Sequence, residues 1–403
     1  MKRGIYIHIP FCVKKCNYCA FLSFDAYTSP RKEYTDALVR ETELRASLTE
    51  DRETVDTVYI GGGTPSVLDV SQLRDIMHAV NECYDVKPDA EITLEANPAT
   101  LGIKDGVTLA KLQAYRYMGI NRLSMGVQAM DNARLDRLGR IHTKENVTRD
   151  MELIRKKGFD NVSLDLMFSV PGETTADALA DLKEVIGFGP EHISCYSLQI
   201  EEGTPFGDMA ANGVLIEVSD EEDRATYHEI CRILRESGYE HYEISNFAKP
   251  GYRSRHNSLY WNMDDYIGLG LGASGFTGGV RYKNTEDLEE YIALISEGRL
   301  PTAEEHVNTA FDNISEAVFT GLRRTEGVTY EEAADAYFRA PDAEGSRPED
   351  SEACRDLFRK VFAEAEKEAE EYAERGLLII DEKGLRLTEQ GIDISNSIMS
   401  LFV

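Results

Sequence analysis

The sequence predicts an α/β protein in which a partial barrel of six strand–helix units precedes a mainly helical, winged-helix-like C-terminal domain. Short β-branched segments alternate with longer amphipathic segments from residue 4 to about residue 246, the pattern of strands and helices around a parallel sheet. Beyond about residue 300 helical segments dominate. The length of 403 residues suits one large domain and a smaller one.

The expected strands are the segments 4–9, 57–61, 91–96, 121–127, 161–167 and 192–198. Between them, apolar side chains recur every three or four residues, as in amphipathic helices, in segments such as 34–48, 109–119 and 146–158. In a barrel of this kind, the loops after the C-terminal ends of the strands build the active site. We therefore expect the functional residues at or directly after the strand ends.

Changes in composition along the chain suggest three parts. Residues 1–250 form the barrel core, and residues 301–403 form the C-terminal domain. Between them, residues 251–300 are rich in Gly, Ser, Asn and aromatics and are expected to be an irregular segment that closes the core. The tail beyond residue 377 reads as two short strands and a terminal helix, and its acidic charge favours packing or partner binding over DNA binding.

The overall charge argues against nucleic acid as a partner. The formal net charge is -28, so no surplus of basic side chains is present to displace counterions from phosphates. The apolar stretch near the N-terminus is too short for a signal peptide, and no apolar run reaches membrane-spanning length. The seven cysteines do not resemble a disulfide framework, and a reducing, cytoplasmic location is expected.

Three of the cysteines are closely spaced directly after the first expected strand. Cys12, Cys16 and Cys19 lie in the run CVKKCNYC, and Ala20 and Phe21 follow, so no fourth cysteine is near. Three thiolates can bind three irons of a four-iron (4Fe-4S) cluster and leave one iron open to another ligand. Zinc is the main alternative, although structural zinc sites use four closed ligands. Three unrelated core cysteines are the remaining reading.

A family resemblance follows from these residues and from the motifs after them. The run YIHIPFCVKKCNYCAF is followed by GGGTPS, LEANP, RLSMGVQ, LGRIH, DLMFSVPGET and HNSLYW. Together they resemble the radical S-adenosylmethionine (SAM) proteins related to anaerobic coproporphyrinogen III oxidase, and most closely the haem chaperone-like branch, HemW. The resemblance spans essentially the whole chain. It implies a radical SAM partial (β/α)6 TIM-like barrel with a 4Fe-4S cluster, SAM and haem as ligands.

The resemblance also implies roles for individual residues. Those assigned to SAM or to the neighbourhood of the cluster are Tyr6, Tyr18, Gly62, Gly63, Thr64, Glu95, Gln128, Arg140 and Asp165. Gln128, Arg140 and Asp165 fall at or after expected strand ends, which suggests that they converge on one site, whereas the others have simpler readings. The glycines could form a tight strand-to-helix turn, Glu95 could make a surface salt bridge, and the tyrosines could be packing residues. The sequence departs from the family's wording at Ser169-Val170, where Gly-Leu is common, and serine loses glycine's freedom at positive φ.

The motif HNSLYW provides the candidate haem contact. His256 could ligate haem iron, with Tyr260 and Trp261 beside the macrocycle. A lone histidine is more often a hydrogen-bonded core or surface residue. His8, close to the cysteines, could instead be a hydrogen-bonding neighbour of the cluster.

Two classes of function compete, and whether the protein is an enzyme is left open. A haem chaperone would bind haem and pass it to an acceptor protein, which can be membrane-associated. An oxygen-independent coproporphyrinogen III oxidase would instead cleave SAM and decarboxylate propionate side chains. The resemblance implies that oxidases carry an N-terminal extension and a fourth cysteine. Only three residues precede the first strand here, and Phe21 stands in place of that cysteine, so the chaperone is favoured. A radical SAM enzyme with another substrate is the third hypothesis.

Overall fold

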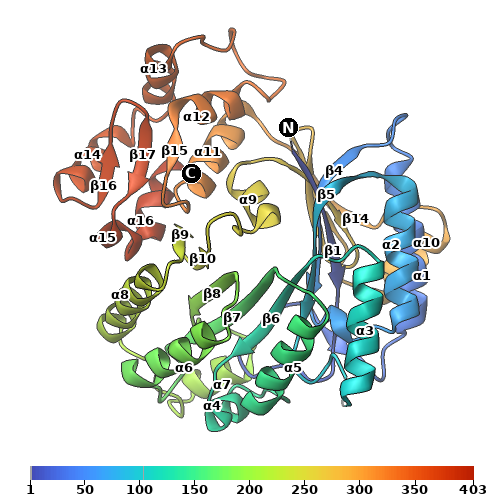
Figure 1. Cartoon of the computed structure of the whole chain (residues 1–403). Coiled ribbons are helices and arrows are strands. Elements are labelled where there is room, and N and C mark those ends of the chain that lie inside the picture. The colour runs from blue at the N-terminus through green and yellow to red at the C-terminus, as the bar shows by residue number, and fades with distance from the viewer. Residues whose placement is uncertain (1, 103) are drawn as a thin grey trace.

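The computed structural model describes residues 2–102 and 104–403 and confirms the predicted partial barrel. Six parallel strands lie side by side in chain order and form its wall (Figure 1). They are β1 (Arg3–Ile9), β4 (Thr54–Gly62), β5 (Asp85–Ala96), β6 (Arg122–Gln128), β7 (Val162–Phe168) and β8 (His192–Ser197). Each of the six segments expected from the sequence falls on one of these strands.

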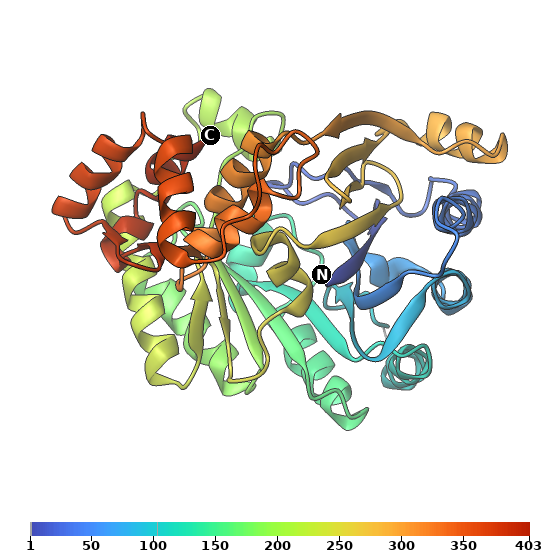
Figure 2. The ribbon, with the colours of Figure 1, turned by 90° about the horizontal axis from the view of Figure 1, so that it is seen from above.

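Helices follow the strands, and Figure 2 shows the longer ones around the convex side of the curved sheet. They are α1 (Arg31–Ala46), the 3-10 turn η1 (Pro65–Val67), α2 (Val70–Cys83), α3 (Asp105–Tyr117), α4 (Asn132–Arg137), α5 (Lys144–Lys156), α6 (Thr175–Gly187), α7 (Pro205–Ala211) and α8 (Asp220–Glu236). Capping boxes begin α2, α5 and α6, in which a side chain at each end of the first turn satisfies free backbone amides.

Further strands extend both edges of the barrel sheet to twelve strands in total. One edge carries β10 (Asn246–Ala248) and β9 (Glu240–Glu243), both antiparallel to their neighbours. At the other edge β11 (Asp265–Leu269) pairs parallel with β1. It is followed by the antiparallel strands β12 (Ser274–Thr277), β13 (Val280–Asn284) and β14 (Thr302–Val307), and the helix α10 (Leu288–Ser296) lies between the last two along the chain.

The expectation that residues 251–300 are irregular is wrong in large part. The segment contains α9 (Arg255–Trp261), three strands of the main sheet and α10. The glycines that suggested a loop are required by close packing between strands. A Cβ on Gly268 would lie 2.0 Å from the backbone oxygen of Ser274, and a Cβ on Gly275 would lie 2.2 Å from the ring of Tyr282.

The C-terminal domain is mainly helical, as the sequence predicts, and occupies one side of the molecule in Figure 1 (orange to red). Its elements are α11 (Ala310–Gly321), β15 (Val328–Thr329), α12 (Tyr330–Tyr337), α13 (Ser351–Val361), α14 (Glu366–Glu374), β16 (Leu378–Ile380), β17 (Gly384–Leu387), α15 (Glu389–Ile392), α16 (Ser395–Met399) and η2 (Ser400–Phe402). Strands β15, β17 and β16 form a separate sheet. Since β14 belongs to the barrel sheet, we propose that this domain begins after Val307.

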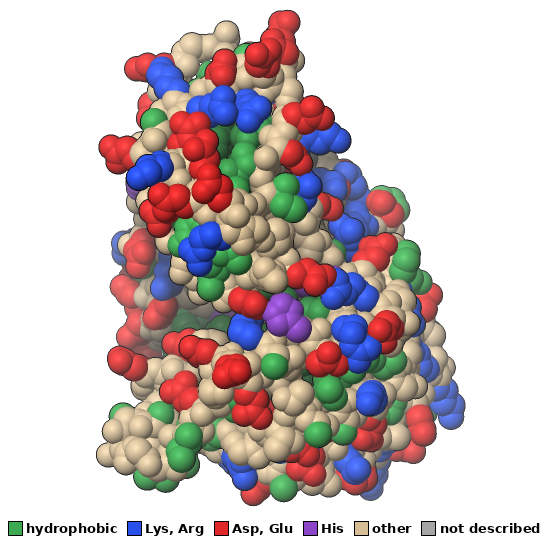
Figure 3. All heavy atoms as spheres, turned by 90° about the vertical axis from the view of Figure 1, so that its left-hand side faces the viewer, with side chains coloured by type: hydrophobic (Ala, Val, Ile, Leu, Met, Phe, Trp, Pro, Cys, Tyr) green, Lys and Arg blue, Asp and Glu red, His purple; other side chains and the backbone are tan. Residues whose placement is uncertain are grey.

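The surface matches the acidic composition. On the face in Figure 3, acidic side chains are interspersed with basic ones rather than separated from them. Among the described residues, no helix combines the length and the apolar character needed to cross a membrane.

Side chains alternate between the two faces of the barrel wall. On β6, Leu123, Met125 and Val127 are fully buried in the hydrophobic core. The residues between them, at 122, 124, 126 and 128, line a cavity on the inner face. Because successive residues of a strand point to opposite faces, an apolar outer face and a polar inner face can coexist on one strand.

A buried carboxylate connects α1 to the extended edge of the sheet. Glu41 is fully buried and accepts hydrogen bonds from the backbone nitrogen of Gly270 at 2.7 Å and from Nδ2 of Asn284 at 2.7 Å. The hydroxyl of Tyr291 donates to the same side chain at 2.6 Å, and Arg45 forms an ion pair with it at 3.4 Å. One side chain thus joins α1, β13, α10 and the turn after β11.

Replacing Glu41 by alanine should lower the free energy of unfolding by about 3 kcal/mol, because three donors and one buried cation lose their acceptor. Denaturant unfolding of the purified protein measures this loss. Glu43→Ala is the matched control on the same helix, since Glu43 forms an exposed pair with Arg40 and should contribute less than about 1 kcal/mol. Equal losses in the two variants would contradict the assigned role of Glu41.

Candidate functional site

The loop with the three cysteines folds over the C-terminal end of the barrel. It begins with β2 (Phe11–Cys12), which pairs in parallel with β3 (Phe24–Asp25), so the two ends of the loop are held together. At its middle, the backbone nitrogen of Asn17 donates to the carbonyl of Leu138 at 3.0 Å, and its side chain donates to the carbonyl of Arg137 at 2.8 Å. The loop is therefore anchored to the segment after α4.

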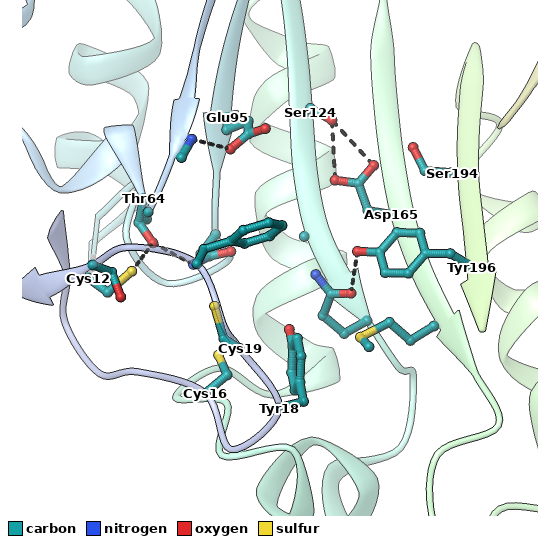
Figure 4. A pocket seen from close by; sticks show the side chains of 18 of the residues that line it. Cys12, Cys16, Tyr18, Cys19, Thr64, Glu95, Ser124, Asp165, Ser194 and Tyr196 are labelled. Carbon is teal, nitrogen blue, oxygen red and sulfur yellow. Dashed lines mark hydrogen bonds between the residues drawn. The ribbon is translucent and has the colours of Figure 1, made fainter. Parts of the chain in front are cut away.

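The three thiols border one space, labelled in Figure 4. The sulfur of Cys12 lies 3.5 Å from Oγ1 of Thr64, and Nη1 of Arg140 donates to the sulfur of Cys16 at 3.4 Å. Burial raises the pKa of the Cys12 and Cys19 thiols. Since thiolates are the form that binds metal, a bound metal would hold these groups deprotonated against the effect of burial.

The positions of the three thiols are compatible with a cluster. Within residues 2–102 and 104–403, no three His, Cys, Asp or Glu side chains converge on a point where one metal ion could be held. In a four-iron cluster each thiolate binds a different iron, so its cysteines need not converge on one point.

The thiols share a cavity of about 560 Å³ with most of the residues singled out in the sequence. The predicted residues that line it are Cys12, Cys16, Tyr18, Cys19, Gly62, Gly63, Thr64, Glu95, Gln128, Arg140 and Asp165. They come from the cysteine loop, from β4 to β7 and from the segment after α4. A cavity of this volume is within the range of small-molecule and cofactor sites.

The glycine turn after β4 is required by its contact with the cysteine loop. Gly62 has φ of 110°, and a Cβ on Gly63 would lie 2.8 Å from the carbonyl oxygen of Phe11. The backbone nitrogens of Gly63 and Thr64 donate to the carbonyls of Ile9 and Phe11 at 2.9 and 2.8 Å. The glycines therefore form the tight turn that was the simpler alternative, and Gly62 and Gly63 also line the cavity.

Glu95, near the end of β5, faces the cavity rather than the surface. Its carboxylate accepts hydrogen bonds from the hydroxyl of Tyr59 at 2.6 Å and from the backbone nitrogen of Gly62 at 3.1 Å. Burial raises its pKa to about 7. Among the described residues it forms no salt bridge, so the surface salt-bridge reading does not apply.

Three further polar residues extend the inner lining. Arg140 donates from Nη2 to Oδ1 of Asn97 at 2.6 Å and to the carbonyl of Gly126 at 2.8 Å. Gln128 ends β6 with φ of 68° and accepts from the hydroxyl of Tyr196 at 3.2 Å. Asp165 lies in the middle of β7, not at its end, and burial raises its pKa. Strand ends alone therefore do not define the site.

Two predicted residues lie outside this cavity. Tyr6 lines a second cavity, and its hydroxyl is 2.9 Å from Nδ1 of His8. His256 is fully buried at the inner face of the sheet. Its Nδ1 is 2.7 Å from Oγ1 of Thr57 and its Nε2 is 2.8 Å from the hydroxyl of Tyr260, which matches the reading of a hydrogen-bonded core histidine.

Several residues of the cavity were not found from the sequence. Arg122 and Ser124 of β6, Tyr59 of β4, and Ser194 and Tyr196 of β8 all line it. A signal was present in RLSMGVQ, where Arg, Ser, Gly and Gln alternate with apolar residues. That period of two marks a strand with one polar face, and the polar face here is the interior of the barrel.

Ser169, where the sequence departs from the family motif, has φ of 60°, so serine occupies the left-handed conformation that glycine would favour.

Comparisons with known proteins agree with this geometry. Residues 6–185 match the model of the Radical SAM superfamily, which implies a 4Fe-4S cluster and SAM as cofactors. The chain is 35% identical to the heme chaperone HemW of Bacillus subtilis, over 100% of this chain and 99% of that protein. It is 34% identical to the heme chaperone HemW of Lactococcus lactis, over 99% of this chain and 96% of that protein.

Among solved structures, the coproporphyrinogen III oxidase HemN of Escherichia coli, a radical SAM enzyme, is similar with a TM-score of 0.82. The two share 25% sequence identity, and the match covers 100% of this chain and 90% of that one. A shared fold does not by itself carry function. The identity along the full length of the HemW relatives decides the family, and the chain belongs to the HemW family of radical SAM proteins.

Proposed function

We propose that the chain holds a 4Fe-4S cluster on Cys12, Cys16 and Cys19, binds SAM at the open iron, and binds haem for transfer to an acceptor protein. The observation that supports the cofactor sites is that the three thiols, the glycine turn and inner side chains of the five strands β4 to β8 line one cavity. The names of the HemW relatives support haem as the ligand.

Within the first cavity, we assign the residues around SAM by their position and chemistry. Gly62, Gly63 and Thr64 lie beside the cysteine loop, where backbone without side chains lets the methionyl part of SAM approach the open iron. Glu95 offers carboxylate oxygens to the ribose hydroxyls or the ammonium group. Gln128, Arg140 and Asp165 complete the proposed SAM site, and Tyr18 lies beside the cysteines as a neighbour of the cluster.

The reduced cluster would supply an electron to the SAM bound at its open iron. The side chains of the protein orient SAM, and hydrogen bonds between them hold these side chains in place. Arg140 is held by Asn97 and by the carbonyl of Gly126, and it places a positive charge beside the Cys16 sulfur. A cation at this distance stabilises the thiolate and the charge of a bound cluster.

The acceptor of the haem is expected to be a protein, which can be membrane-associated, and the chain itself is expected to act in the cytoplasm. The acidic charge of -28 favours a protein acceptor with basic surface over nucleic acid. Haem transfer requires that the ligand is bound where it can leave, so its site must open to solvent.

The second candidate function is oxidation of coproporphyrinogen III, which the likeness to HemN supports. The position of Phe21 argues against it, since this residue replaces the cysteine expected in oxidases and its ring is 71% exposed at the mouth of the cavity. Decarboxylation of coproporphyrinogen III by the reconstituted protein with SAM and a reductant would favour the oxidase.

Replacing Cys16 by serine should remove most of the bound iron and the brown absorbance, because two thiolates cannot hold the cluster that three hold. Iron and sulfide analysis after anaerobic reconstitution measures the loss. Cys83→Ser is the matched control, since Cys83 lies singly at the end of α2. Retention of four irons in Cys16→Ser would contradict the cluster assignment.

SAM binding should become about tenfold tighter between pH 6 and pH 8 if the Glu95 carboxylate contacts SAM. The pKa of Glu95 is raised to about 7, so the group is mostly protonated at pH 6 and must lose its proton before it can bind as a carboxylate. Equilibrium dialysis across this range tests the slope. Glu95→Gln should bind SAM weakly with a flat pH profile, and an unchanged slope would exclude Glu95 as its origin.

Titration of haemin into the cluster-loaded protein should give a saturable change in the Soret band. The change reports a defined site because nonspecific adsorption does not saturate at a fixed ratio. Absorbance difference spectra against a protein-free titration measure it. The absence of saturation would reject haem binding and with it the proposed transfer function.

A further inference from the structure

A second cavity of about 530 Å³ lies beside the first. It is bordered by β1, by the end of the cysteine loop, by α9 and by the strands β11 to β13. Among the described lining residues, the two cavities have Ala20 and Phe21 in common. A ligand in the second cavity would therefore be separated from the cluster site by a single stretch of the cysteine loop.

The walls of this cavity suit a large, flat ligand. Aromatic side chains come from the cysteine loop and from β1, α9, β11 and β12, and they are Tyr6, Phe21, Tyr260, Trp261, Tyr266 and Phe276. The rings of Tyr260 and Tyr266 meet edge to face with centroids 4.7 Å apart. The indole nitrogen of Trp261 is buried without a hydrogen-bond partner among the described residues. Haem presents such a flat apolar surface, and aromatic rings pack against it favourably.

The same cavity carries a cation for an acidic substituent. Arg281 lines it, with its guanidinium 4.8 Å from the centroid of the Phe276 ring. Nη1 of Arg281 donates to the hydroxyl of Tyr266 at 3.2 Å, and the guanidinium forms an ion pair with Glu316. An arginine fixed in this way can donate to a carboxylate such as a haem propionate.

A histidine suited to iron also faces this cavity. Nδ1 of His8 is 2.9 Å from the hydroxyl of Tyr6, whereas its Nε2 has only a long contact of 3.4 Å with the carbonyl of Leu22. Burial lowers the pKa of His8, so the imidazole is neutral at pH 7. Iron binds neutral imidazole, and metal-ligating histidines typically have their other nitrogen held by a hydrogen bond.

His256 differs from His8 at Nε2, which is already engaged in a short hydrogen bond. Both of its ring nitrogens lie within 2.8 Å of a hydroxyl, one of Thr57 and one of Tyr260, and the side chain is fully buried. Coordination of iron would break one of these bonds and open the inner face of the sheet. Its contact with Tyr260 instead fixes a ring that lines the second cavity.

We propose that haem binds in the second cavity with Nε2 of His8 as an axial ligand of its iron and with Phe21 against its face. This inference rests on the proposed haem-binding function and adds the place and the ligand. It assigns His256 a positioning role through Tyr260. The ring of His8 also abuts the glycine turn, since a Cβ on Gly62 would lie 2.5 Å from Cε1 of His8. His8, the proposed iron ligand, is thus in direct contact with the glycine turn that is proposed to hold SAM.

The proposed axial ligand is tested by removing the imidazole of His8 and supplying free imidazole in its place. Haemin is added to the cluster-loaded wild type, His8→Gly and His256→Gly, and the axial ligand is followed by resonance Raman spectroscopy with excitation in the Soret band. His8→Gly should lose the imidazole signature, and free imidazole in the buffer should restore it. His306→Ala is the control, because His306 is exposed at 65% of its side chain. A wild-type spectrum in His8→Gly, or rescue by imidazole in His256→Gly instead, would overturn the proposal.

The cavity is tested by a substitution that does not disturb folding. Phe21 is 71% exposed, so Phe21→Ala should fold normally and raise the haem dissociation constant roughly two- to tenfold, the range of a lost aromatic contact. Tyr27→Ala is the matched control, since Tyr27 is 75% exposed nearby in the sequence and is not among the residues that line either cavity. Equal affinities of Phe21→Ala and wild type would reject the second cavity as the site.

The proposed haem-binding function and the proposed position of the haem site are rejected by different results. If the wild type shows no saturable haem binding, the proposed function itself is wrong. If the wild type binds haem and neither His8→Gly nor Phe21→Ala changes the spectrum or the affinity, haem binds elsewhere and only this inference is wrong.

Discussion

The close approach of the glycine turn to the cysteine loop is the constraint on which the rest of the site depends. Two backbone hydrogen bonds, from Gly63 to Ile9 and from Thr64 to Phe11, join the end of β4 to the start of the loop. No side chain fits on Gly63 at this distance, because a Cβ would lie 2.8 Å from a backbone oxygen. The bonds bring three thiols to the C-terminal mouth of the barrel, and they place His8 against the same turn. A cofactor that needs both the thiols and the turn can then bind at one point.

The polar interior of the barrel has an energetic cost that its hydrogen bonds offset. Buried polar groups without partners are destabilising, and most of those on the inner face are paired. His192 is bonded to Ser163 and Tyr242, and His256 is bonded to Thr57 and Tyr260. Arg122 differs, because its Nε is buried without a partner among the described residues. Arg122 begins β6 and lines the first cavity, so this unpaired nitrogen belongs to a side chain that borders the proposed cofactor site.

The sequence predicts the strands of the barrel well because each is a short β-branched run, and the period of two is a local property. It fails at Gly268 and Gly275, where glycine indicated a loop. Glycine is needed there because a Cβ on Gly268 would clash with the backbone of Ser274, and a Cβ on Gly275 would clash with the ring of Tyr282. These neighbours come close only in the folded protein. The same limit applies to His256. Its partner Thr57 is 199 residues away in the chain, so the motif suggested a ligand where the fold makes a core contact. The family motifs, in contrast, predicted residues that mostly line the first cavity, although Arg122, Ser124, Tyr59, Ser194 and Tyr196 of that cavity were missed.

Phe21 connects the two cavities to the choice between functions. Other large apolar side chains, such as Tyr27 at 75%, are exposed as much as Phe21 at 71%, so the position of Phe21 rather than its exposure sets it apart. The ring borders both cavities, so it covers one side of the cluster loop and offers an apolar face to the other side. A cysteine at this position would add a thiol near the open iron and remove the aromatic wall from the second cavity. A phenylalanine does the reverse. It adds no thiol to those of Cys12, Cys16 and Cys19 and contributes an aromatic ring to the second cavity, and the proposed preference for haem binding over porphyrin oxidation depends on this difference.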